Sequence, residues 1–211
     1  MFVDRADAAR KLLDRLPPFD PAATAVIALP RGGLPLADVI AQALHLPLDI
    51  VLVRKVGMPG QPEFAAGAVT DAGGVAVTVN PAALEAGLTE ERVRAMARDE
   101  LAELRRRRAL YQGGRAPLPV KGKTVLVVDD GIATGATMRA ALRLLRAAGA
   151  ARLVLAVPVA PADVLADLAR DADETICLET PAPFFAVGMH YQTFDQVSDA
   201  EAAEILRRHA R

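Results

Sequence analysis

Two adjacent carboxylates, Asp129 and Asp130, are followed at once by a loop of small and hydroxyl-bearing residues in this 211-residue chain. The loop reads Gly-Ile-Ala-Thr-Gly-Ala-Thr over residues 131–137. Small residues let backbone N–H groups approach a phosphate closely, and the hydroxyls of Thr134 and Thr137 can donate to it. Ionised carboxylates only accept hydrogen bonds and repel a phosphate, so the acidic pair suits sugar hydroxyls or a metal ion. Together the two halves predict a site for a sugar phosphate.

The acidic pair stands between a predicted strand and a predicted helix. Residues 125–128 are four consecutive apolar residues, three of them β-branched, a run typical of a strand buried on both faces of a parallel sheet. Apolar residues at helical spacing follow the loop at Met138, Ala141, Leu142 and Leu145. This order places the loop at a helix amino terminus, where unpaired N–H groups and the positive dipole end favour an anion.

Residues 125–137 resemble the 5-phosphoribosyl-1-pyrophosphate (PRPP) signature of type I phosphoribosyltransferases, which has four apolar residues, two acidic residues and small residues ending in Thr-Gly-x-Thr. The resemblance implies that Asp129 and Asp130 hold the ribose 2′- and 3′-hydroxyls and take part in catalysis. The 5′-phosphate would lie against the residues that close the signature, which are Ala133, Thr134, Gly135, Ala136 and Thr137. Three other interpretations fit less well. A Walker A loop would carry a lysine here, a receiver-type acidic pair normally opens its domain, and a purely structural turn needs neither two acids nor two threonines.

A second strand–loop–helix unit precedes the signature. We predict a strand over residues 22–29 and a helix over residues 34–46, joined by the loop Pro-Arg-Gly-Gly. Ligands of open α/β sheets gather at the carboxyl ends of strands, so this loop is expected to face the first one across a crevice. Arg31 supplies a positive charge, while Gly32 and Gly33 allow the backbone to approach an anion. By resemblance this is the pyrophosphate-binding loop, in which the family often has a cis peptide bond not involving a proline nitrogen.

A basic residue follows the next predicted strand, over residues 48–53. Lys55 resembles a lysine that many phosphoribosyltransferases place near the pyrophosphate, which makes it a catalytic candidate; the alternative is a solvated side chain at a sheet edge. Residues 57–62 are rich in Gly and Pro and predict irregular structure. Residues 65–69 and 74–79 predict a β-hairpin.

Residues 81–115 read as a helical insertion. Thr89 predicts the start of a long helix with an imperfect capping box, and Gly113-Gly114 predicts its end. The four consecutive arginines at 105–108 could form a nucleic-acid patch, but such a run on a half-buried helix is usually a solvated face with local ion pairs. In the family that this chain resembles, the region before the signature strand carries a mobile catalytic lid. The insertion is expected to be that lid or to dock beside it.

The tail, residues 180–211, is expected to form a hood and a carboxyl-terminal helix. Four of the eight aromatic residues of the chain fall within eleven positions of it: Phe184, Phe185, Tyr191 and Phe194. A planar base would bind by stacking on such rings, although some of them must hold the tail on the domain. The pattern Phe-x-Val-Gly followed by Tyr-x-x-Phe resembles the hood of purine phosphoribosyltransferases. It implies that Phe185 stacks on the base and that backbone near Val187 reads the base edge.

Length and composition favour one α/β domain over residues 1–211. Strands and helices alternate from residue 22 to residue 178, which predicts a doubly wound, mostly parallel sheet flanked by helices. The net charge of −1 gives no support for a general polyanion-binding surface, and the lone Cys177 cannot form an internal disulfide. No signal peptide and no apolar run of ~20 residues is found, so we expect a cytoplasmic protein that does not contact a membrane.

The reaction that the resemblance implies is displacement of pyrophosphate from ribose C1 of PRPP by a nitrogen of a base. Mg²⁺ is expected to arrive with PRPP rather than on dedicated protein ligands, with Asp129 and Asp130 as the protein groups that could touch it. Ala133 matches the adenine enzymes rather than those of 6-oxopurines, which commonly have Asp there, whereas the hood resembles purine enzymes in general. The acceptor base is therefore left open, as is a homodimer, and no residue has a clear claim as general base.

Two further functions stay open. A PRPP-sensing regulator would keep this ligand site but act on nucleic acid; the near-neutral charge and the lack of an amino-terminal helix-turn-helix argue against it, whereas the four arginines at 105–108 keep it open. An unrelated sugar-phosphate binder is the weaker alternative.

Overall fold

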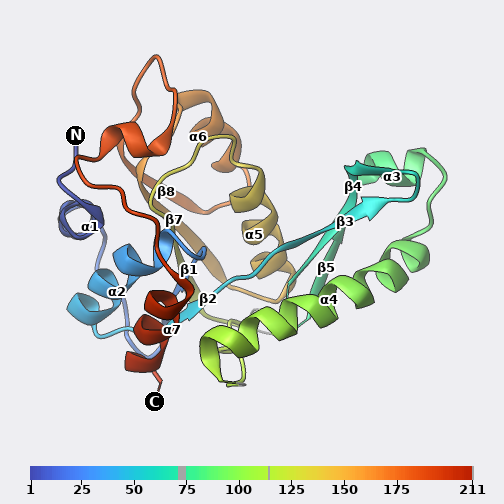
Figure 1. Cartoon of the computed structure of the whole chain (residues 1–211), viewed down its shortest axis with the longest axis horizontal. Helices are drawn as coiled ribbons and strands as arrows, with labels where there is room; N and C mark the ends of the chain where they lie inside the picture. Colours follow the sequence, from blue (N-terminus) through green and yellow to red (C-terminus); the bar gives the residue numbers. More distant parts are fainter. Residues whose placement is uncertain (71–74, 114, 211) are drawn as a thin grey trace.

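The computed structural model describes residues 1–70, 75–113 and 115–210, and in this part of the chain the strands form two sheets (Figure 1). The larger sheet has five parallel strands in the order β2-β1-β6-β7-β8. Its strands are β1 (Thr24–Ala28), β2 (Leu48–Ile50), β6 (Thr124–Val128), β7 (Arg152–Val159) and β8 (Glu174–Glu179). The predicted α/β class with a mostly parallel sheet is confirmed.

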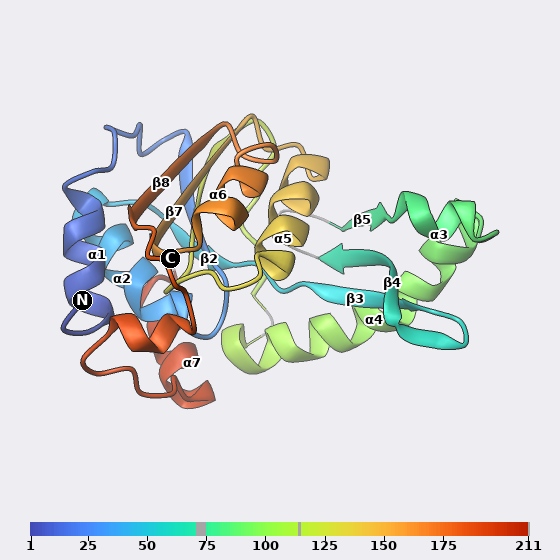
Figure 2. The same cartoon turned by 90° about the horizontal axis from the view of Figure 1, so that it is seen from above.

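Helices cover both faces of this sheet, as a doubly wound fold requires (Figures 1 and 2). Leu126 and Val128 of β6 pack into one core cluster, whereas Val125 and Val127 pack into another. Successive side chains of a strand point to opposite faces, so the continuous apolar run fills both cores at once. The first cluster includes residues of α1 (Arg5–Leu13), α2 (Gly33–Leu44) and α7 (Asp199–Arg208), and the second includes residues of α5 (Ala136–Ala147) and α6 (Ala162–Leu168).

The second sheet is antiparallel and belongs to an extension that we call the arm, residues 54–113 within the described part of the chain. It consists of β3 (Arg54–Met58), β4 (Gln61–Thr70), β5 (Ala76–Val79), α3 (Pro81–Glu85) and α4 (Glu90–Gln112). Figure 2 shows the arm reaching out to one side of the parallel sheet. It has its own small core, centred on Val56, Val69 and Val93, and Ala68 and Ala76 pack on Leu144 of α5.

The long helix of the arm begins and ends where the sequence predicts. The Thr89 side chain accepts a hydrogen bond from the Arg92 N–H, and Gly113 closes the helix in the left-handed conformation with φ +59°. The predicted hairpin is also present, since β4 and β5 pair with Thr70 opposite Ala76, while residues 71–74 lie outside the described residues.

The prediction for residues 48–62 is wrong in two respects. The parallel strand β2 ends at Ile50 rather than at residue 53, and residues 57–62 are largely extended. Only Pro59 and Gly60 form the turn between β3 and β4, with Gly60 at φ +76°. Proline and glycine thus mark a tight hairpin turn here rather than an irregular segment.

The arginine run at 105–108 is a solvated face only in part. Arg106 and Arg107 pair with Glu103 on the surface of α4, as expected. Arg108 is instead buried, 3.0 Å from an oxygen of the equally buried Asp49, and it donates to the Ile50 carbonyl. This contact fastens α4 to the end of β2. No helix in the described residues is long and apolar enough to span a membrane.

Replacing Arg108 with Met should therefore destabilise the fold by about 3 kcal/mol or more, because it leaves the Asp49 carboxylate buried without its cation. The free energy of unfolding in urea measures the effect. Arg106→Gln is the matched control, since its exposed pair with Glu103 contributes little to stability. Equal losses in the two variants would contradict the structural role given to Arg108.

Candidate active site

The two predicted ligand loops lie side by side because their strands are neighbours. Ala28 pairs with Val128 across β1 and β6, and the Leu29 N–H donates to the Val128 carbonyl over 3.0 Å. A Cβ atom added to Gly32 would lie 2.2 Å from Oδ2 of Asp130, and one added to Gly33 would lie 2.8 Å from the Val128 carbonyl oxygen. Only glycine allows the loops to approach this closely.

The peptide bond between Pro30 and Arg31 is cis, as the resemblance implied for this loop. The Arg31 guanidinium lies 3.5 Å from Oδ1 of Asp199, at the start of α7. The Tyr111 hydroxyl of the arm donates to the same oxygen over 2.9 Å. The loop, the arm and the carboxyl-terminal helix therefore meet at Asp199.

The loop after β6 forms a shallow depression at the amino terminus of α5. The depression has a volume of about 180 Å³ and is lined by Asp129 and residues 131–138. Gly135 occupies the N-cap position with φ +73° and no side chain caps the first turn, which contains no acidic residue. The backbone N–H groups of this turn can therefore bind an anion. Thr134 and Thr137 are exposed beside it.

Asp129 lines this depression, and the buried Asp130 follows it in the chain. Asp129 is half-buried, and its Oδ1 accepts the Asp130 N–H over 2.9 Å. Burial, and then the neighbouring Asp130 carboxylate, raise the pKa of Asp129 well above its ordinary range. Burial also raises the pKa of Asp130, although the Arg5 guanidinium opposes that shift. Two acids that are costly to ionise together at a surface depression are typical of a binding site rather than of a structural turn.

Arg5 is a site residue that the sequence did not reveal. Its Nε and Nη2 atoms each lie 2.8 Å from Oδ2 of Asp130, and its guanidinium lies 4.0 Å from the centre of the Phe194 ring. The apolar residues at helical spacing over residues 5–16 predict only a short amphipathic helix that includes this residue. One signal was available, because a cation in the first turn of a helix opposes the helix dipole and so implies a specific anionic partner.

The hood lies across from the signature loop. Val187 begins the short 3-10 helix η1 (Val187–His190), and a Cβ atom on Gly131 would lie 2.5 Å from a Val187 methyl group. Phe185 is 73% exposed, whereas Phe184 stacks on His190 with ring centres 5.3 Å apart. A groove of about 730 Å³, the hood groove, is lined by Ala133, Thr134, residues 161–164, residues 180–182, Phe184 and Phe185. The exposed ring of Phe185 thus lines a groove that also includes Ala133 and Thr134 of the loop after β6.

The sequence predicts Lys55 directly after a strand of the parallel sheet, but β2 ends five residues before it, at Ile50. Lys55 is the second residue of β3 in the arm, opposite Ala68, and its side chain is exposed. The other predicted residues of the donor site come from the two loops just described.

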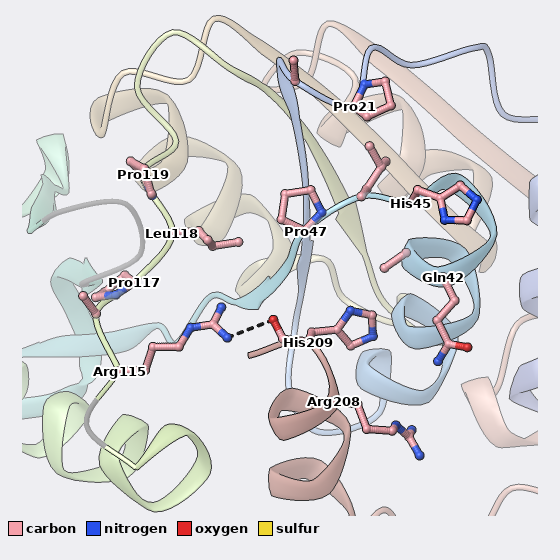
Figure 3. A pocket seen from close by; sticks show the side chains of 14 residues that line it. Pro21, Gln42, His45, Pro47, Arg115, Pro117, Leu118, Pro119, Arg208 and His209 are labelled. Atoms are coloured by element: carbon pink, nitrogen blue, oxygen red, sulfur yellow. Dashed lines mark hydrogen bonds between the residues drawn. The ribbon is translucent and has the colours of Figure 1, made fainter. Parts of the chain in front are cut away.

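A larger cavity, of about 880 Å³, opens at the opposite edge of the parallel sheet (Figure 3). Its lining includes Pro47, which directly precedes β2, and Ala22, two residues before β1. Arg115 donates to the His209 carbonyl across it over 3.1 Å. Ligands of open α/β sheets bind at the carboxyl ends of the strands. The depression after β6 lies at that end and the larger cavity does not, so we assign the site to the depression although it is smaller.

Glycine-containing loops after neighbouring parallel strands are typical of α/β proteins that bind nucleotides or sugar phosphates. Comparison with known proteins makes the class specific, since the family model for the phosphoribosyl transferase domain matches residues 5–193. The chain therefore belongs to the phosphoribosyl transferase family.

Two relatives are similar over nearly the whole chain. "Putative phosphoribosyl transferase Rv0571c" of Mycobacterium tuberculosis is 46% identical over 208 residues, which are 99% of this chain and 47% of that protein. The chain thus spans about half the length of this curated relative. The crystal structure of TT1426 from Thermus thermophilus is 40% identical, with a TM-score of 0.86 over 100% of this chain and 99% of that one.

Replacing Asp129 with Asn should stabilise the ligand-free protein near neutral pH. The pKa of Asp129 is higher in the folded than in the unfolded chain, so its contribution to stability is lost as pH rises from about 4 through the folded pKa. Asn does not ionise, so the variant does not lose folding stability in this way as pH rises. Its melting temperature should exceed that of the wild type by a margin that widens with rising pH, measured with a metal chelator present.

Asp173→Asn is the control of opposite sign. The Leu153 N–H and the Arg146 guanidinium lower the pKa of Asp173, so this carboxylate stabilises the fold above its unfolded pKa and loses that effect as pH falls. Its replacement should reduce the melting temperature at neutral pH and matter less in acid. If both variants shift in the same direction, the account of the Asp129 environment is wrong.

Proposed function

We propose that the protein transfers the 5-phosphoribosyl group of PRPP to a nitrogenous base and releases pyrophosphate. The observation that carries this is the direct contact between the two ligand loops, with Gly32 against the carboxylate of Asp130. It brings an uncapped helix amino terminus, an acidic pair and an arginine–glycine loop within one ligand's reach. A phosphate, a ribose and a pyrophosphate in sequence match these three groups in charge and hydrogen-bonding capacity.

In this arrangement the 5′-phosphate binds residues 133–137 and the ribose hydroxyls bind Asp129 and Asp130. The pyrophosphate lies against Arg31, Gly32 and Gly33, whose donors stabilise the negative charge that develops as the bond to C1 breaks. The carboxylates orient the ribose and favour the positive charge of an oxocarbenium-like ring. Catalysis then rests on positioning and electrostatics. Lys55, in the arm, is proposed to lie near the pyrophosphate, and the arm is proposed to act as a lid.

Mg²⁺ fits this site as a companion of PRPP. Among the side chains that the structure describes, no group of three or more His, Cys, Asp or Glu could hold a metal. Mg²⁺ is commonly bound by one or two carboxylates together with ligand phosphates, and Asp129 on the wall of the depression suits that mode. The ion would neutralise charge on the pyrophosphate, while Asp129, with Asp130 beside it, would hold the ribose end.

The acceptor base is proposed to enter the hood groove. Phe185 offers an exposed ring for stacking, and backbone near Val187 offers hydrogen bonds. Ala133 contributes a methyl group to the lining of the groove, whose other residues include Asp163. The run at 105–108 no longer favours a nucleic-acid-binding regulator, because Arg106 and Arg107 pair locally and Arg108 is buried. These observations support an enzyme over the regulator.

Titration calorimetry with PRPP and Mg²⁺ tests the donor site. The wild type should bind, and Asp129→Asn combined with Asp130→Asn should weaken binding at least ~100-fold, since two charge-assisted hydrogen bonds are lost. Asp171→Asn, which removes a carboxylate paired with Arg139 and Arg143, should bind like the wild type. Absence of binding by the wild type would refute the proposal.

Pyrophosphate release across a panel of purine and pyrimidine bases tests the acceptor site. At least one base should be active, and Phe185→Ala should raise its KM about tenfold with PRPP affinity unchanged, because stacking is worth ~1–3 kcal/mol. Met189→Ala is the matched control, since Met189 is also exposed in the hood (60%) but does not line the groove. No turnover on any base, with PRPP bound, would move the assignment to the regulator.

A further inference from the structure

The Arg5 guanidinium lies between the acidic pair and the tail of the chain. Two of its nitrogens, Nε and Nη2, converge on one oxygen, Oδ2 of Asp130, at 2.8 Å each. The third, Nη1, donates to the Asp195 carbonyl over 2.8 Å, and the face of the guanidinium lies on Phe194. Each of the three nitrogens has a partner, so the side chain is held in one orientation.

This contact is largely shielded from water. The side chains of Arg5 and Asp130 are each 12% exposed, and charge-assisted hydrogen bonds are stronger in such surroundings than on an open surface. Both contacts use Oδ2, so Oδ1 of Asp130 is the oxygen that Arg5 leaves for a ligand.

The backbone of Asp130 is fixed by the same part of the molecule. The Tyr191 hydroxyl donates to the Asp130 carbonyl over 2.6 Å. Tyr191 is in turn fixed to the amino-terminal segment, because Phe2 forms a parallel β-bridge with it and packs its ring 5.3 Å away. The start and the end of the chain therefore hold both the main chain and the side chain of this acid.

We propose that Arg5 is a positioning residue for the donor site, fixing the Asp130 carboxylate so that Oδ1 is presented to a ribose hydroxyl; this inference rests on the PRPP site proposed above. Asp129 and Asp130 are adjacent like charges, and a free Asp130 carboxylate would rotate away from its neighbour. Arg5 removes that freedom and offsets the repulsion. It acts through Asp130 and does not itself touch PRPP.

A double-mutant cycle tests this mode of action. The variants are Arg5→Gln, Asp130→Asn and the two combined, with the Kd for PRPP and Mg²⁺ measured by calorimetry. Arg5→Gln should weaken binding about tenfold in the wild-type background and no more than about twofold when Asp130 is already Asn, because residues that act through one another are not additive. A change in folding alone would weaken binding by the same factor in both backgrounds.

Two further variants complete the design. Arg5→Lys keeps the charge but not the paired donors, so its affinity should lie between those of the wild type and Arg5→Gln. Arg10→Gln, on the exposed side of the same helix, should bind PRPP like the wild type. If Arg5→Gln does not fold, Arg5→Lys takes its place in the cycle, with the same pattern expected at a smaller factor.

The outcomes separate the two proposals. Equal losses in the two backgrounds would overturn the positioning role while leaving the PRPP site intact. Failure of the wild type to bind PRPP would instead overturn the proposed function on which the positioning role rests.

Discussion

Two ionisable carboxylates held side by side and partly out of water are the constraint on which the site depends. Asp129 and Asp130 repel each other and lose hydration, so the fold must supply compensating donors. It does so with the Asp130 N–H on one acid and the Arg5 guanidinium on the other. The parallel sheet only brings the loops to one edge. Contacts of Arg5 and Tyr191 with Asp130 then offset part of the free-energy cost of holding two carboxylates together there.

The parts of the structure that could be predicted are those determined by interactions between residues close together in the sequence. Residues 125–128 indicate a strand buried on both faces, and the glycine–threonine loop indicates a helix amino terminus, because each pattern reflects contacts within a few residues. The parallel class of the sheet also followed from alternating units. The two ligand loops could be placed at one edge for the same reason, since strands of a parallel sheet end on the same side.

What could not be predicted depends on partners that are distant in sequence. Arg5 and Asp130 are 125 residues apart, and Arg108 and Asp49 are 59 apart, so no local pattern distinguishes these arginines from solvated ones. The error at residues 57–62 has another cause. A Pro-Gly turn inside a hairpin and a Pro-Gly-rich loop share the same composition, and only the pairing of β3 with β4 tells them apart.

The contacts of Arg5 and Tyr191 with Asp130 also bear on how the chain folds during synthesis. Asp195, which accepts the third hydrogen bond of Arg5, lies 190 residues after it and is synthesised later. Contacts of such high sequence separation form late, because the long loop between them must close first. A nascent chain can therefore build most of the parallel sheet, and even the signature loop, before Tyr191, Phe194 and Asp195 of the tail make their contacts with Asp130 and Arg5. Asp130 is therefore held by both its side chain and its main chain only once the tail has returned to the amino-terminal segment.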